Sequence, residues 1–471
     1  MAEPWFQFGA QWKARCFVCG EPYDHYRTDE RHCKKCEDRY RQEQFFQAVP
    51  HLASCFATIM PETGAITERL MHRGFRDVFL GSGDGGRGPW DLLKKAFLSQ
   101  LRLPCGQPVL FPLKRLAEFA GLGGTWVLDL SPYIWSGTLK DLRSWAVLSL
   151  AIEHSIKHLA LWTAGNAGYS LAKLVHRWNA TVPTDQRKTV YCLVDASAPP
   201  EMVVTLRSLQ CRVAPISTGS GTILSREQLY HVVASLTDIH KDYWQVTDGW
   251  DGVGVFMYSL LARQCFHFLR SKMREIQKLK SANVYAILPL GTGNLLLGFI
   301  RGAEHGDAEQ PKREGRVKVV AAVPYGDHMM MAFPPPEGRQ MTVTDRPRMR
   351  RDLPEAPKLT GFYSPLSPCL WHLAQNRDFA DPKAVEFMEV DRAAQIEAAA
   401  RVLGPGPAEA MTVAAEPSAL IAFGALKQLA QRIRDHGKDP EECVALVVNS
   451  GFGIMGMKEQ EFYTKSIFAF R

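Results

Sequence analysis

The stretch "LWTAGNAGYSLAKL" (Leu161–Leu174) runs from an apolar strand pattern through a turn of small residues into a helical pattern. A second stretch, "AILPLGTGNLLLGF" (Ala286–Phe299), has the same three parts in the same order. Backbone N–H groups exposed at such a turn, at a helix N-terminus, form a cradle for an anion such as phosphate. In the second stretch the residues of this turn are Gly291, Thr292, Gly293 and Asn294. A tight strand-to-helix connection that needs glycine explains either turn equally well when the turn is taken alone.

Similar patterns continue along the chain from about Leu101, where apolar β-rich runs alternate with helical patterns. Helices are predicted for "DLRSWAVLSLAIEHSIK" and for Asn166 to Trp178. Strands are predicted for "GGTWVLDL", "HLALWTAG", "TVYCLVDA", "CRVAPIS", "VYAILPLG", "VKVVAAVP" and "CVALVVNSG". This alternation predicts an α/β fold of parallel sheets with helices on both faces. The Pro-, Met- and Arg-rich segment 324–368 interrupts it and is predicted to be a long irregular excursion or lid, with disorder as the alternative.

The overall composition narrows the class of protein. With 471 residues, 46% of them hydrophobic, the chain can bury a large core divided among about one to three domains. A net charge of +7 is mild for this length and does not favour nucleic-acid binding. The N-terminus has no apolar signal segment, so secretion is not expected. The longest uncharged run, Asn283 to Ile300, contains a proline and three glycines, which predicts a strand, a loop and a helix rather than a membrane span. Eleven cysteines do not resemble a secreted disulfide framework, which predicts a cytosolic protein with reduced thiols.

Four of the cysteines are clustered in "CFVCGEPYDHYRTDERHCKKC", as two CxxC pairs. Each pair can place two thiolates on one knuckle, and two knuckles complete a closed tetrahedral zinc site with no open position for a substrate. The predicted ligands of this structural zinc are Cys16, Cys19, Cys33 and Cys36. The alternatives are four free thiols or an iron site with the same ligands. Basic neighbours also permit a nucleic-acid-binding ribbon, although a solvated charged face explains them as well.

Other glycine-rich and polar turns carry less information by themselves. "GSGDGG" (Gly81–Gly86) matches GxGxxG but has no convincing strand before it and no long helix after it, so it is not a dinucleotide fingerprint. "WSGTLKDLRSW" (Trp135–Trp145) places Lys140 between a polar turn and a helical run, where a surface lysine would be ordinary. "VVNSGFG" places Ser450 where a strand meets a glycine turn.

Taken together and in order, these segments resemble the fold-type II pyridoxal-phosphate enzymes of the tryptophan synthase β-chain superfamily, and most closely threonine synthase and cysteate synthase-like proteins. "SGTLKDLRS" resembles the PTGSFKDRG lysine segment, and "TAGNAG" resembles SSGNxG. "PLGTGNLLLGF" resembles the phosphate-binding loop, "EPSALIAFGAL" resembles EPSGAAALAAL, and "VVNSGFGIMG" resembles VLTGHGLKD. The four-cysteine knuckle also recurs in threonine synthase-like proteins.

The resemblance implies a role for each matched residue. Lys140 would form the Schiff base with the cofactor, Asn166 would contact its ring hydroxyl, and Ser450 would face its ring nitrogen. The turn Gly291–Asn294 would hold its phosphate. The residues that match substrate-binding positions are Ser136, Thr138, Arg143 and Thr163. Three departures surround the substrate: Ala164 stands where many relatives have a hydroxyl, Arg143 is displaced by one place, and Phe452 stands where histidine is frequent.

The resemblance also implies an architecture and an assembly. Residues 1–60 would form the zinc knuckle, residues 61–144 and 273–471 a large α/β domain, and residues 145–272 a small α/β domain. Relatives are commonly homodimers, which extends to this chain by analogy.

The implied activity is β- or γ-replacement or elimination on an O-activated amino acid through a Lys140 Schiff base, with O-phosphorylation as the expected activation. Pyridoxal phosphate supplies the electron sink, and the protein supplies orientation and electrostatics. A dehydratase or ammonia-lyase reaction is the alternative within the enzyme class. A catalytically silent zinc-ribbon protein that binds nucleic acid is the alternative of another class, and the basic run Arg346–Arg351 gives it some support.

Overall fold

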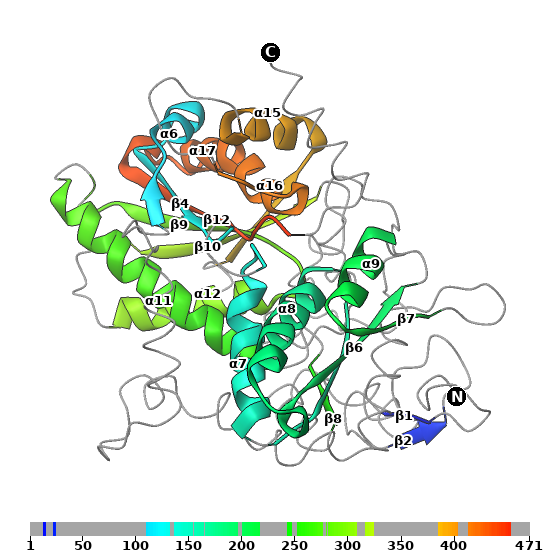
Figure 1. The fold of residues 1–471 in the computed structure, drawn as a ribbon. Coiled ribbons are helices and arrows are strands. Elements are labelled where there is room, and N and C mark those ends of the chain that lie inside the picture. The colour runs from blue at the N-terminus through cyan, green and yellow to red at the C-terminus, as the bar shows by residue number, and fades with distance from the viewer. Residues whose placement is uncertain are drawn as a thin grey trace, which may run out of the picture.

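The computed structural model describes 14 segments of the chain, which are residues 13–15, 22–24, 110–131, 136–153, 155–163, 165–195, 200–216, 243–246, 252–276, 279, 281–308, 316–324, 385–403 and 413–453. They form a six-stranded sheet, a four-stranded sheet and a small hairpin near the N-terminus (Figure 1). The four predicted zinc ligands, and all of the predicted irregular segment after Pro324, lie outside the described residues.

The larger sheet has the strand order β11-β10-β9-β12-β4-β3. Its strands are β3 (Leu110–Pro112), β4 (Gly124–Asp129), β9 (Asn283–Pro289), β10 (Val317–Pro324), β11 (Val385–Val390) and β12 (Cys443–Asn449). All neighbours are parallel except the edge strand β3, which pairs antiparallel with β4. Val447 of β12 pairs with Val127 on one side and with Ile287 on the other. The carboxyl ends of β4, β9 and β12 therefore lie together at one edge.

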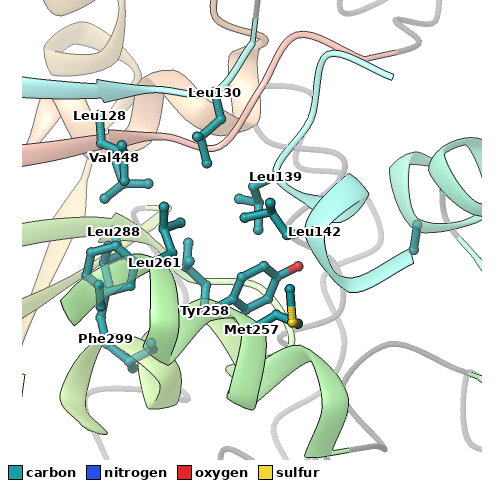
Figure 2. Close-up of a cluster of buried hydrophobic side chains, with 14 of the residues drawn as sticks. Leu128, Leu130, Leu139, Leu142, Met257, Tyr258, Leu261, Leu288, Phe299 and Val448 are labelled. Atoms are coloured by element: carbon teal, nitrogen blue, oxygen red, sulfur yellow. The ribbon is translucent and has the colours of Figure 1, made fainter. Parts of the chain in front are cut away.

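The central strands of this sheet are largely apolar and buried, and residues of both of their faces belong to apolar cores, so both faces of the sheet are covered. Val127, Ile287 and Val447 pack on one side, against α6 (Lys114–Ala120), α15 (Arg392–Leu403), α16 (Pro417–Gly424) and α17 (Leu426–Asp435). The alternate residues pack on the other side against α7 (Lys140–Glu153), α11 (Gly252–Glu275) and α12 (Asn294–Ala308). Figure 2 shows part of this second layer, with Leu128, Leu288 and Val448 facing α11 and α12.

The smaller sheet has the order β7-β6-β5-β8 and is parallel throughout. Its strands are β5 (His158–Trp162), β6 (Thr189–Asp195), β7 (Arg212–Ile216) and β8 (Tyr243–Gln245). Helix α8 (Asn166–Thr181) and the short helix η3 (Thr184–Gln186) connect β5 to β6, and α9 (Pro200–Ser208) connects β6 to β7. The buried side of α8, which includes Leu171 and Val175, joins the same apolar core as α7. The lysine segment therefore lies between the two sheets.

The predicted parallel α/β architecture is confirmed, and each of the seven predicted strands is present. Of the strands in the two larger sheets, β3, β8 and β11 were not predicted. Strands β3 and β8 have only three residues each, and Glu386 and Glu389 interrupt the apolar pattern of β11, which as an edge strand remains partly exposed. The domain boundaries stay predictions. Within the described part of the chain, no helix combines the length and apolar character that a membrane crossing requires.

Candidate active site

The candidate site lies where three loops leave the carboxyl edge of the six-stranded sheet. Residue 130 follows β4, residue 290 follows β9, and Ser450 follows β12. Ligands of parallel α/β sheets bind at this edge, in the loops beyond the strand ends. Two of the loops begin helices directly: α7 starts at Lys140 and α12 at Asn294.

The lysine segment is held against the loop after β12 by main-chain hydrogen bonds. The Leu139 amide donates to the Ser450 carbonyl at 3.0 Å, and the Phe452 amide donates to the Gly137 carbonyl at 2.7 Å. Between them, Thr138 and Gly451 form an antiparallel bridge. We call this arrangement the backbone clamp: Gly137–Leu139 against Ser450–Phe452. It brings Lys140 and Ser450, two residues predicted to contact the cofactor, to the same place.

Lys140 itself is partly buried at the first position of α7. Leu139 and Leu142 on either side of it are each 3% exposed. Figure 2 shows them directed into the apolar cluster that contains Met257 and Tyr258 of α11. The apolar neighbours thus fix the backbone that carries the lysine.

The turn before Lys140 is closed by the side chain of Asp141. Its Oδ2 accepts from the Ser136 amide at 2.7 Å, and its Oδ1 accepts from the Ser136 hydroxyl at 2.6 Å. The Ser136 and Thr138 hydroxyl oxygens are 3.0 Å apart. Burial raises the pKa of Asp141, and the hydrogen bonds from Ser136 oppose that rise. Ser136 and Thr138 are buried and hold this turn, while their predicted contact with a substrate remains a prediction.

Asn166 begins α8, in the turn after β5, and its helix start is stabilised by Thr163. The Thr163 hydroxyl oxygen accepts from the amides of Gly165 at 3.1 Å and Gly168 at 2.9 Å. These bonds satisfy N–H groups that the first turn of a helix leaves unpaired. The structure therefore gives Thr163, a predicted substrate-binding residue, a capping role.

A carboxylate joins Asn166 to the loop of the backbone clamp. The Asn166 side-chain amide nitrogen donates to Glu416 Oε1 at 2.8 Å, and the Gly453 amide donates to Glu416 Oε2 at 3.2 Å. The buried Asn166 Oδ1 has no hydrogen-bond partner among the described residues. A Cβ on Gly453 would lie 2.1 Å from this oxygen and 2.9 Å from Thr138 Cγ2. Asn166, Thr138 and the 450–453 loop are therefore packed closely together, and position 453 has no room for a side chain.

The glycine-rich turn meets α7 and α11 on the same side of the sheet. A Cβ on Gly254, in the first turn of α11, would lie 2.8 Å from the Asn294 amide nitrogen and 3.2 Å from Arg143 Cδ. Asn294 is 1% exposed and Arg143 is fully buried. The Arg143 guanidinium donates to the Val246 carbonyl after β8. Arg143 thus connects α7 to the four-stranded sheet, and its predicted contact with a substrate remains a prediction.

A buried carboxylate under the clamp was not predicted. Asp129 Oδ1 accepts three hydrogen bonds: from the Ser131 amide at 3.0 Å, the Ser131 hydroxyl at 2.8 Å and the Asn449 amide nitrogen at 2.8 Å. Asn449 Oδ1 in turn accepts from the Gly451 amide at 3.2 Å. Burial raises the pKa of Asp129, and the bonds from Ser131 and Asn449 oppose the rise.

Asp129, Asn449 and Glu416 share one signal that sequence reasoning could have used. Each is a polar residue directly at the end of an apolar strand or at the start of an apolar helix. Glu416 even belongs to the quoted "EPSALIAFGAL" segment, but only the helix start of that segment was interpreted.

The fold resembles that of known structures, although sequence comparison finds no counterpart. No protein-family model and no curated protein matches the chain. Apo diaminopropionate ammonia lyase from Escherichia coli superposes with a TM-score of 0.51 at 16% identity, covering 81% of this chain and 90% of that one. The same lyase with an aminoacrylate–pyridoxal phosphate azomethine intermediate gives 0.53 at 14% identity, covering 81% and 92%. At this level of identity the likeness establishes the α/β fold.

Proposed function

We propose that this chain is a pyridoxal-phosphate enzyme that acts on an amino acid with a leaving group on its β- or γ-carbon. The observation that carries the proposal is the meeting of Lys140 with the Ser450 loop and, through Glu416, with Asn166. These are residues that the family resemblance assigns to the cofactor. The shared fold of diaminopropionate ammonia lyase supports it.

The residues present fit the cofactor. Asn166 offers a buried oxygen without a partner among the described residues, beside a position where any side chain on residue 453 would collide. The turn at Gly291–Asn294 ends at the N-terminus of the 15-residue helix α12, which suits an anionic phosphate. Ser450 follows β12 at the same sheet edge.

When bound, pyridoxal phosphate would supply an electron sink for the substrate α-carbon. The protein's own groups would do the remaining work. The Lys140 amine would hold the aldehyde and carry the α-proton, Asn166 would bind the ring hydroxyl, and the Gly291–Asn294 turn would bind the phosphate. A hydroxyl at Ser450, rather than a carboxylate, would leave the ring nitrogen largely neutral.

Elimination with release of ammonia is the reaction class that the structural comparison favours, because the superposed enzyme is named as an ammonia lyase. Replacement on an O-phosphorylated amino acid follows from the resemblance to threonine synthase and cysteate synthase-like proteins. Incubating the protein with phosphorylated and acetylated serine and homoserine separates the two. Keto acid plus ammonia indicates elimination, whereas a substituted amino acid indicates replacement.

The decisive test of the cofactor is the visible spectrum of the purified protein after incubation with pyridoxal phosphate. We expect a violet band that borohydride removes and that Lys140→Ala lacks. Lys114→Ala is the matched control, because Lys114 is also the first residue of its helix, α6, but is solvent-exposed. A wild-type chain that stays colourless would refute the proposal.

We also propose structural zinc at Cys16, Cys19, Cys33 and Cys36. In the described residues, β1 (Lys13–Arg15) ends directly before Cys16 and pairs antiparallel with β2 (Pro22–Asp24), so a hairpin flanks the first CxxC pair. Elemental analysis should find one zinc per chain and a marked loss in Cys33→Ser. Cys265→Ser, at a buried free thiol, should keep the metal. Iron instead of zinc would contradict the assignment.

A further inference from the structure

Glu416 occupies a place where three parts of the candidate site meet. It is 2% exposed and directly precedes Pro417, the first residue of α16. Its own amide donates to the Gly451 carbonyl at 3.0 Å, so its backbone is tied to the backbone clamp. Its side chain reaches Asn166 on the four-stranded sheet's side of the site. The N-terminus of a helix stabilises a negative charge at such a position.

Two hydrogen bonds that this carboxylate accepts determine which way the Asn166 amide faces. One oxygen accepts from the Gly453 amide, which can only donate, and the other accepts from the Asn166 side chain. A carboxylate has no proton to give, so the end of the Asn166 amide toward Glu416 must be the nitrogen. Asn166 Oδ1 is then held at the opposite end, over Gly453. The donor end of the Asn166 amide therefore faces Glu416, and its acceptor end faces Gly453.

We propose that Glu416 is a positioning residue that fixes the orientation of the Asn166 amide toward the cofactor's ring oxygen. The proposal rests on the proposed function, because Asn166 is the residue expected to contact that oxygen. An amide nitrogen and an amide oxygen beside the ring hydroxyl favour opposite positions of its proton. Glu416 thus sets the protonation of the bound cofactor without touching it.

The test is Glu416→Gln, which replaces one acceptor by a donor of nearly the same shape. The Gly453 amide can only donate, so it keeps the side-chain oxygen of the new glutamine as its acceptor. The glutamine nitrogen then faces Asn166, whose amide must rotate so that its oxygen accepts from that nitrogen. We expect the ratio of the violet to the near-ultraviolet absorption band of the bound cofactor to change by about fivefold, which is the change in an equilibrium constant that one hydrogen bond typically causes. In an Asn166→Ala background the same substitution should leave the ratio unchanged.

Glu397→Gln is the matched control, because Glu397 accepts from Lys427 on the protein surface. If Glu416→Gln fails to fold, Gly453→Ala tests the same point, since its Cβ displaces the Asn166 amide without altering the carboxylate. It should change the band ratio in the wild-type background but not with Asn166→Ala. If the variant has the band ratio of wild type, or if the change in ratio persists in the Asn166→Ala background, the role proposed for Glu416 is overturned while the proposed function stands. A colourless wild type overturns the proposed function and this inference with it.

Discussion

The loops that meet at the candidate site are held in two different ways. On the six-stranded sheet, the backbone clamp joins the lysine segment to the 450–453 loop through main-chain hydrogen bonds of 2.7 and 3.0 Å. On the four-stranded sheet, the turn of Asn166 is hydrogen-bonded to the same loop through the side chain of Glu416.

This difference separates what backbone geometry determines from what individual side chains determine. Main-chain bonds persist through most side-chain substitutions, so the clamp depends on the positions where only glycine fits. The Asn166 contact depends on the chemical identity of one residue. We therefore expect the position of Lys140 to tolerate most substitutions and the orientation of Asn166 to be sensitive to them.

The largest effect should come from Gly451→Ala, which breaks the clamp. Gly451 has φ of +142°, and a Cβ there would lie 2.6 Å from both the Gly137 carbonyl oxygen and Thr138 Cα. Because the neighbouring atoms are backbone, we expect a loss of about 3 kcal/mol in the free energy of unfolding, measured by urea denaturation. Cofactor capture by Lys140 should fall as well.

Gly437→Ala is the control for this substitution. Gly437 also has positive φ, +70°, but nothing lies within 4 Å of its Cβ position. It should lose only about 1 kcal/mol, the strain of the backbone conformation alone. Equal losses at the two positions would show that the close contact in the clamp is unimportant.

The fold was largely predictable because its signals are local. The seven predicted strands are buried apolar runs. In both strand-turn-helix motifs, the helix begins directly after the turn of small residues. Lys140, Asn166 and Asn294 each begin a helix, as the sequence predicted or the motif implied. Periodicity and turn composition suffice for such features.

The tertiary contacts were not predictable, because they join residues far apart in the chain. Asn166 and Glu416 are 250 positions apart, and Asp129 and Asn449 are 320 apart. Nothing in a strand pattern indicates which acceptor a distant amide will meet. Ser136 and Thr163 show the same limit locally, since the sequence did not predict the hydrogen bonds that they make within their own turns. Their contact with a substrate stays a prediction.

The next largest effect concerns Asp129, which supports the clamp through Asn449. Asp129→Ala leaves the donors of Ser131 and Asn449 without their buried acceptor, so we expect a loss of about 2 kcal/mol in the free energy of unfolding. Asp129→Asn should be far milder. All three hydrogen bonds reach one oxygen, Oδ1, which an asparagine retains.

The same pair of variants predicts a pH dependence. Burial raises the pKa of Asp129 in the folded protein above the ordinary value of 3.8. The folded state therefore binds the proton more tightly, so this group's contribution to stability is present below 3.8 and is lost as pH rises through the folded pKa. In urea titrations from acid to neutral pH, the unfolding free energy of wild type minus that of Asp129→Asn should therefore fall as the pH rises. A difference that grows with pH would contradict this sign.

The smallest effect should come from Thr163→Val, in the turn of the four-stranded sheet that carries Asn166. Valine keeps the shape but removes the oxygen that accepts from Gly165 and Gly168, which costs about 1 kcal/mol of unfolding free energy. Because the affected turn carries Asn166, cofactor affinity should also fall. Thr181→Val, at the exposed end of the same helix, should change neither quantity measurably. If Thr163→Val lowers stability while affinity stays at the wild-type level, the start of α8 does not set the position of Asn166, and Glu416 alone does.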